Sequence, residues 1–317
     1  MSSSPVEKRR GWHWSDYWLS GRAEVMTVNT PTGPVTFGAE ALWAAYFNGF
    51  DDGARLLDLA TGSGQVAGYA AAAATAAGKA FEVVGVDYAE APPPGPDAGY
   101  ALMGGVALES LPFPTAHFDG AASQFGLEYA DPRPALAELA RVLKPGGRVL
   151  MLIHHADSAI TRQTADQIAA YDRVLGTGGV IRQARRAFAT RLKPAPPATR
   201  QAAAEAFCEA VNRAAARLDP RPAFEPVRYL VGYLRDLAER LDSYDPASAL
   251  ARLDAFETGN AAWRQRQLCQ TRAALDAAGL DALVARGTRA GLELAERSPQ
   301  HDAGGALIGW RVGFLRS

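Results

Sequence analysis

Two glycines in one turn are the residues of this chain that point most directly to chemistry. The segment from Arg55 to Gly64 reads RLLDLATGSG, an apolar run that leads into a turn containing Gly62 and Gly64. Glycine has no Cβ, so this backbone can bend tightly and lie close to a ligand. A helix that begins at such a turn presents unpaired N–H groups to the ligand. The segment therefore predicts a site for a nucleotide-like molecule.

Asp87 ends the next apolar run, FEVVGVD, and is the second candidate for binding. The carboxyl ends of neighbouring parallel strands share one edge of a sheet, so we expect Asp87 beside the glycine turn. A carboxylate there can accept hydrogen bonds from both hydroxyls of an adenosine ribose. The alternative is an ordinary solvated acid at a strand end, and this feature alone favours neither.

A reaction that removes a proton from a weakly acidic substrate needs a general base, and the intrinsic pKa of histidine suits that role. His154 and His155 end the strand RVLMLIHH, and His13 is a weaker alternative. Adjacent strand residues point to opposite faces, so we expect at most one of the pair to face a substrate. A structural hydrogen-bonding role is the alternative for each. Gln124, at the end of the preceding strand, is a candidate for contacting cofactor or acceptor.

The elements that position these residues alternate between strand and helix. A helix is expected over 65–77, ended by Gly78, and another from Asp131-Pro132 to the stop at 144–147. Strands are expected at 118–123 and 148–155. This order predicts an α/β fold, a doubly wound and mostly parallel sheet of Rossmann-like type.

These motifs together resemble a class I S-adenosylmethionine-dependent methyltransferase, similar to the branch with the ubiquinone and menaquinone C-methyltransferases. The matching segments are LLDLATGSG (56–64), VGVD (84–87), ESLPFPTAHFD (109–119), FGLEYADP (125–132) and ELARVLKPGGRVLML (138–152). The resemblance covers about residues 55 to 155, and it implies S-adenosyl-L-methionine as the cofactor. The cofactor-binding residues it implies are Asp58, Ala60, Gly62, Gly64, Asp87, Tyr88, Ala107, Leu108 and Gln124.

Two positions depart from the family pattern. Ala60 stands where the first glycine of D-x-G-x-G-x-G is usual, a change that preserves the backbone contact. Ala107 stands where an aspartate usually contacts the adenine amino group, so adenine recognition must use backbone groups near Ala107 and Leu108. Glu109 keeps acidic character nearby, although a surface role is the simpler interpretation.

Composition excludes several classes of function. The chain has 317 residues and a net charge of −1, which argues against a dedicated nucleic-acid binder. Cys208 and Cys269 are isolated, so neither a metal site nor a disulfide framework is expected. The absence of a leader pattern or a membrane-length apolar run predicts a cytoplasmic protein with no membrane span. The oligomeric state stays open.

Three regions lie outside the core of the resemblance, namely an N-terminal segment, a long insertion and the C-terminal part. Residues 1–50 are rich in aromatic side chains, which could form a lid over the cofactor's cationic sulfonium or simply pack a helix on the sheet. Residues 157–260 contain helical patterns at 158–175, 180–192, 201–217, 227–241 and 246–257. We interpret them as a cap over the acceptor site, inserted into a core made of 51–156 and 261–317.

The C-terminal part of that core is expected to close the sheet. It contains a helix at 261–278, ended by Gly279, and an antiparallel hairpin whose loop runs from Pro299 to Gly305. The function expected is methyl transfer to oxygen, nitrogen or activated carbon of a small-molecule acceptor. The alternatives are a catalytically silent S-adenosylmethionine-binding protein and, less favoured, a nicotinamide-dependent oxidoreductase.

Overall fold

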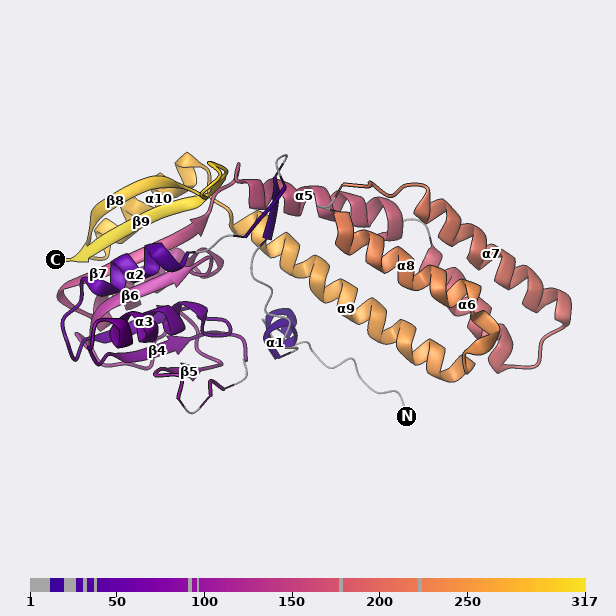
Figure 1. The fold of residues 1–317 in the computed structure, drawn as a ribbon, viewed down its shortest axis with the longest axis horizontal. Helices are drawn as coiled ribbons and strands as arrows, with labels where there is room; N and C mark the ends of the chain where they lie inside the picture. The colour runs from indigo at the N-terminus through magenta and orange to yellow at the C-terminus, as the bar shows by residue number, and fades with distance from the viewer. Residues whose placement is uncertain are drawn as a thin grey trace. The chain divides into compact units, whose positions relative to one another are not determined.

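The structure, a computed structural model, describes residues 12–19, 27–30, 33–36, 39–90, 93–95, 97–176, 179–221 and 224–317. The chain divides into two compact units. The first consists of Met1–Arg162 with Cys269–Ser317, and the second of Gln163–Leu268. The sheet lies in the first unit, whereas the second is helical (Figure 1).

A seven-stranded sheet organises the first unit, in the spatial order β5-β4-β3-β6-β7-β9-β8. Neighbours from β5 to β7 are parallel, and the β8–β9 hairpin is antiparallel and joins the sheet edge through β9 (Figure 1). The strands are β3 (Arg55–Leu59), β4 (Glu82–Val86), β5 (Ala101–Met103), β6 (Phe118–Gln124), β7 (Leu143–His154), β8 (Leu292–His301) and β9 (Leu307–Arg316). The doubly wound fold and the antiparallel C-terminal strands are confirmed.

Helices cover both faces of this sheet, and β7 shows why. Leu150 and Leu152 pack with α2 (Glu40–Asn48) and α3 (Gln65–Ala76). The alternate residues Val149, Met151 and Ile153 pack with α4 (Pro132–Val142) and α10 (Ala277–Arg289). Successive strand side chains point to opposite faces, so this all-apolar run requires a helical layer on each side.

The predicted ends of two helices are confirmed. Gly78 follows Ala77, the C-cap of α3, and has φ +63, a conformation that favours glycine. Asp131 caps α4, because its carboxylate accepts the Arg133 N–H at 3.1 Å, and Pro132 opens the helix.

The N-terminal segment contributes α1 (Trp12–Leu19) and a separate antiparallel hairpin of β1 (Thr27–Thr30) and β2 (Gly33–Thr36). Trp43 and Phe47 of α2 lie in the core, as the packing interpretation of the aromatic residues expects. Residues 1–11 and 20–26 lie outside the described residues.

The second unit has its own apolar core, built from α6 (Val180–Leu192), α7 (Pro197–Ala215) and α8 (Glu225–Glu239) together with parts of two longer segments. These segments are α5 (Ala159–Tyr171) with the π-helical turn Asp172–Gly176, and α9 (Pro246–Ala273). Phe188 and Phe207 are fully buried in this core. The predicted helices of the insertion are thus present.

Two predicted helix boundaries are wrong. The sequence pattern predicts one helix that ends at 257 and another that begins at 261, but α9 runs unbroken through Thr258 and Gly259. Gly279 does not end a helix either: it lies in the first turn of α10, where its N–H donates to the Asp276 carboxylate at 2.7 Å. A glycine inside a long helix costs only about 1 kcal/mol, which the rest of the helix offsets.

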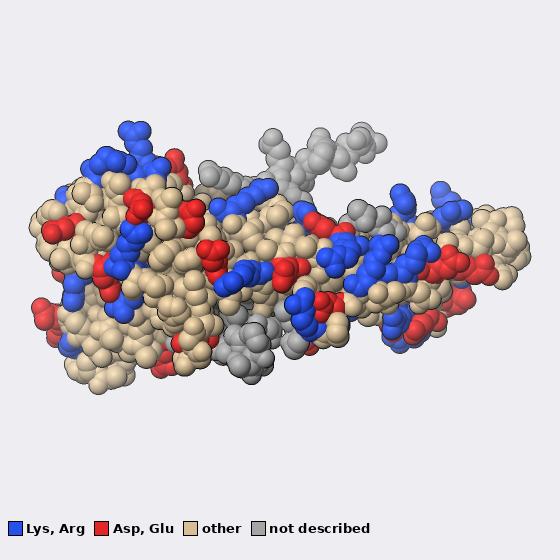
Figure 2. All heavy atoms as spheres, turned by 90° about the horizontal axis from the view of Figure 1, so that it is seen from above, with Lys and Arg blue, Asp and Glu red and all other residues tan. Residues whose placement is uncertain are grey.

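Basic and acidic side chains are interspersed on the face shown in Figure 2. Within the described ranges, no helix combines the length and apolar character needed to cross a membrane.

Candidate functional site

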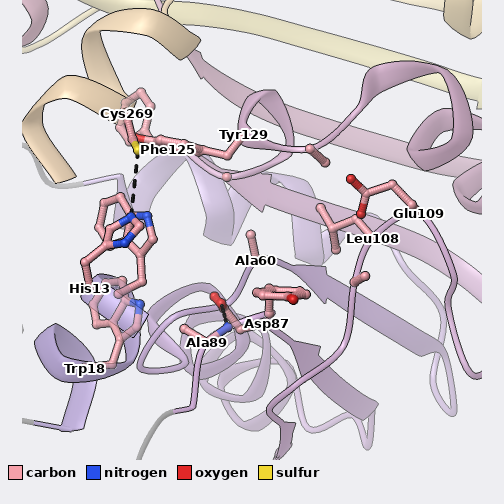
Figure 3. Close-up of a pocket in the computed structure, with 15 residues that line it drawn as sticks. His13, Trp18, Ala60, Asp87, Ala89, Leu108, Glu109, Phe125, Tyr129 and Cys269 are labelled. Atoms are coloured by element: carbon pink, nitrogen blue, oxygen red, sulfur yellow. Dashed lines mark hydrogen bonds between the residues drawn. The ribbon is translucent and has the colours of Figure 1, made fainter. Parts of the chain in front are cut away.

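A cavity of about 340 Å³ opens where β3, β4 and β6 end (Figure 3). This is the point where the strand order reverses, the usual ligand site of a doubly wound sheet. Small-molecule sites commonly measure about 300–1,000 Å³. The lining residues are His13, Trp14, Trp18, Ala60, Asp87, Tyr88, Ala89, Ala107, Leu108, Glu109, Phe125, Gly126, Tyr129, Ala130 and Cys269.

Asp87 lies on the floor of this cavity, directly after β4. One carboxylate oxygen accepts the Gly62 N–H at 2.8 Å and the other accepts the Ala89 N–H at 2.7 Å. Burial raises the pKa of Asp87, and these backbone hydrogen bonds oppose that rise. The carboxylate thus connects the glycine turn to the loop after β4, and Asp87 lines the cavity.

Asp58 does not line the cavity; it is 3% exposed beneath the turn. One of its oxygens accepts both the Thr61 hydroxyl at 2.5 Å and the Ala67 N–H at 3.1 Å. Burial raises its pKa to about 7, although the hydrogen bonds to Thr61 and Ala67 act in the opposite direction. In this structure Asp58 therefore positions the turn and the start of α3.

The glycine turn is covered by aromatic side chains in this structure. Gly62 has φ +55, and a Cβ there would lie 2.6 Å from a ring carbon of Trp18. Gly64 has φ +89, and its Cβ would lie 2.8 Å from the Tyr100 ring. Neither glycine is among the cavity-lining residues. Ala60, which does line it, has φ +54, so it adopts the conformation for which the family's glycine is suited.

The opposite wall is the segment Ala107–Glu109 (Figure 3). It is held through its backbone, because the Val106 N–H donates to the Asp87 carbonyl at 2.9 Å and the Ser110 N–H donates to the Ala107 carbonyl at 3.1 Å. Ala107 presents no polar side chain to the cavity. Recognition of an adenine by backbone groups of this segment stays a prediction.

Gln124 is not among the lining residues. Its side-chain oxygen accepts the Trp43 indole N–H at 2.7 Å, and its amide nitrogen donates to Gln65 at 3.1 Å. Both contacts hold the end of β6 to the helices α2 and α3. A cofactor could contact the Gln124 side chain only through hydrogen-bonding capacity that these two contacts leave unused.

The two histidines lie next to the site without lining it. His154 is 2% exposed, its ring stacks on Phe125 with centroids 4.4 Å apart, and burial lowers its pKa to about 3. Its Nδ1 has no hydrogen-bond partner among the described residues. His155 stacks on Trp310, its Nδ1 accepts the Asp157 N–H at 2.9 Å, and burial lowers its pKa as well.

Phe125, Tyr129 and Cys269 line the cavity, although they were not among the site residues expected from the sequence. Phe125 and Tyr129 follow the end of β6 within FGLEYADP, so their place after a strand end was a usable signal. Cys269 lies 3.8 Å from the His13 Nε2 (Figure 3), and no local pattern marks it, because α9 brings it from the far end of the chain.

Glu128 is a further group that the sequence analysis did not single out. One oxygen accepts the His154 N–H at 2.8 Å, and the other is buried without a partner among the described residues. Burial raises its pKa to about 7, opposed by backbone hydrogen bonds.

Comparison with known proteins agrees with this geometry. Residues 57–151 match the family described as a methyltransferase domain, type 11. The ubiquinone/menaquinone biosynthesis C-methyltransferase of Geobacter sulfurreducens is 34% identical over 130 residues, which cover 37% of this chain and 50% of the relative. The 2-phytyl-1,4-naphtoquinone methyltransferase of Synechococcus elongatus is 33% identical over 142 residues, which cover 41% of this chain and 60% of the relative.

The matched stretch contains the glycine turn, Asp87 and the walls that follow β5 and β6. The chain therefore contains a class I S-adenosylmethionine-dependent methyltransferase domain of the type 11 branch. It spans only about half the length of the curated relatives that it matches. The solved structure of a SAM-dependent methyltransferase from Methanosarcina mazei aligns with this chain at 14% identity and a TM-score of 0.38. The alignment covers 86% of this chain and 96% of the Methanosarcina chain.

Proposed function

We propose that this protein transfers a methyl group from S-adenosylmethionine to oxygen, nitrogen or activated carbon of a small, partly apolar molecule. The observation that carries the proposal is the position of Asp87: a carboxylate that faces a cavity at the strand ends while it holds the glycine turn. The names of the matched relatives specify quinone substrates, which supports an apolar, cyclic acceptor.

The residues present fit this cofactor. Asp87 can accept the ribose hydroxyls, while Ala60, Ala89 and Ala107 leave room for a flat ring system. Bound S-adenosylmethionine supplies a methyl carbon on a positively charged sulfur, which an acceptor atom attacks in line. Trp14 and the other aromatic side chains can face that positive charge and keep water out. Correct positioning of two reactants can supply roughly 7–11 kcal/mol of the barrier.

We propose further that α1 acts as an aromatic lid and that residues 157–260 form a cap over the acceptor. Support for the lid is that His13, Trp14 and Trp18 line the cavity. Support for the cap is topological, since the insertion follows the end of β7, beside the strand ends. A crystal structure with cofactor and acceptor tests both. An acceptor enclosed by the first unit alone would contradict the cap.

Calorimetry with S-adenosylmethionine, S-adenosylhomocysteine and NAD tests the cofactor assignment. Asp87→Asn removes the charge and one of the two oxygens that accept the Gly62 and Ala89 N–H groups, and we expect binding of both sulfur ligands to weaken by about 1.5–3 kcal/mol or more. The matched control is Asp97→Asn, at an exposed residue outside the cavity, which should bind as the wild type does. Tight NAD binding with no binding of either sulfur ligand would identify an oxidoreductase instead.

Turnover separates an enzyme from a silent binding protein. Formation of S-adenosylhomocysteine is measured with 2-phytyl-1,4-naphthoquinone, in its reduced form, and with phenol and amine analogues as probes. Methylation of any of these supports the proposal and identifies the atom methylated. Cofactor binding without methylation of any acceptor class would favour the silent alternative.

A further inference from the structure

A second hollow, of about 410 Å³, lies between α4 and α10, the two helices on one face of the sheet. It is lined by Arg133, Ala137, Arg286, Arg289 and Ala290, and it shares no residue with the cavity at the strand ends. Three of the five lining residues thus carry a positive charge, and the other two are small. The hollow presents guanidinium groups around an open space.

These three arginines differ from their neighbours, because no ion pair or side-chain hydrogen bond engages them among the described residues. Arg141, also on α4, pairs with Glu138 at 2.7 Å. Arg316 donates to the Ala140 and Gly291 carbonyls, at 2.8 Å and 3.1 Å. The side chains of Arg141 and Arg316 therefore have hydrogen-bond or ion-pair partners within the described residues, whereas those of the three arginines around the hollow have none.

The carboxylates of the same two helices are already engaged. Asp131 and Asp276 cap the helices by accepting backbone N–H groups. Glu138 pairs with Arg141, and Asp281 pairs with Arg297. None of these four acids forms an ion pair with Arg133, Arg286 or Arg289.

The helix dipole explains only part of the arrangement. Arg286 and Arg289 lie in the last turn of α10, where a positive charge is stabilising. Arg133 lies in the first turn of α4, where the dipole opposes a positive charge. The dipoles therefore favour the charges of Arg286 and Arg289 but not that of Arg133, which is exposed at the rim of the hollow.

We propose that Arg133, Arg286 and Arg289 form a binding site for a phosphate-bearing anion with two or more negative charges. A guanidinium group donates two parallel hydrogen bonds to a phosphate, and three groups around one hollow can hold adjacent phosphates. Ala137 and Ala290 leave the space that such a ligand needs. A free diphosphate and an anionic lipid headgroup share this chemistry.

The test uses two probes on the full chain. Calorimetry measures binding of inorganic pyrophosphate, and sedimentation measures binding to vesicles of phosphatidylcholine with phosphatidylglycerol. The test variant is Arg133→Gln/Arg286→Gln/Arg289→Gln, which keeps much of each apolar stem. The matched control is Arg186→Gln/Arg200→Gln/Arg235→Gln, which changes net charge equally at exposed arginines of the second unit.

We expect the wild type and the control to bind at least one probe, and the test variant to bind it roughly tenfold or more weakly. Pyrophosphate binding indicates a soluble ligand, and vesicle binding alone indicates a lipid headgroup. Absence of binding to both probes would overturn the proposal, as would an equal loss in the control. Thermal unfolding and S-adenosylmethionine binding of the test variant verify that it is folded, because the cavity at the strand ends shares no residue with the hollow.

Discussion

The indole of Trp18 lies directly on Gly62, so close that a methyl group at Gly62 would come within 2.6 Å of a ring carbon. Gly62→Ala therefore meets two penalties, the positive φ and the contact with the ring. We expect it to lower the free energy of unfolding by about 1–2 kcal/mol from the backbone alone, with the contact adding to this. Chemical denaturation measures the change.

The two penalties can be separated by two further variants. Gly53 has φ +76 with nothing within 4 Å of a Cβ, so Gly53→Ala measures the backbone penalty by itself. In a Trp18→Ala background, the cost of Gly62→Ala should fall to that of Gly53→Ala. An undiminished cost in that background would mean that the Trp18 contact does not act on the turn.

Ala60 has φ +54, a conformation that costs an L-residue free energy and costs glycine little. Ala60→Gly should therefore raise the free energy of unfolding, by about 0.5–1 kcal/mol after the greater flexibility of the unfolded glycine is subtracted. Ala67→Gly is the contrasting control, because Ala67 lies in α3, where glycine costs about 1 kcal/mol. A loss of stability in Ala60→Gly would show that its Cβ contacts outweigh the backbone strain.

The pKa of Asp58, raised by burial from 3.8 to about 7, makes stability depend on pH. The folded state holds this proton more tightly than the unfolded state, so between about pH 4 and 7 stability falls as the pH rises. Asp58→Asn removes the titration and can still accept hydrogen bonds from Thr61 and Ala67. Relative to the wild type, the variant should gain stability between pH 5 and pH 8 in denaturant titrations. If the free energies of unfolding of the variant and the wild type differ by the same amount at pH 5 and pH 8, the raised pKa of Asp58 is contradicted.

His154 and His155 remain our candidate bases, and paired variants distinguish a base from a packing residue. His154→Phe preserves a ring stacked on Phe125 and should cost less than about 1.5 kcal/mol of stability. His154→Ala leaves a cavity and should cost about 2–5 kcal/mol.

Turnover then gives the second measurement. Loss of a general base lowers rates by roughly 10²- to 10⁴-fold, so this loss in a stable His154→Phe or His155→Phe variant identifies the base. Since the two side chains point to opposite faces, we expect the two variants to differ. Wild-type rates in both would leave catalysis to positioning alone.

The local sequence predicted the elements well where one pattern dominated a segment. The apolar run of β7, with core residues on both faces, required two helical layers, and Asp131-Pro132 located the start of α4. The motif order predicted the methyltransferase domain and the place of Asp87 beside the glycine turn. These features depend on neighbours in the chain, whose spacing the sequence displays directly.

The tertiary structure decided which predicted residues reach the cavity. Asp58 is buried beneath the turn, Gln124 bonds to Trp43, and His154 stacks behind Phe125. The sequence by itself predicted the alternation of strands and helices and the Asp131 cap, and the order of its motifs predicted the family of the domain, because these features depend on residues close together in the chain. Only the folded chain decided that Cys269 meets His13 and that Trp18 covers Gly62, since contacts between distant segments depend on how all the layers pack together.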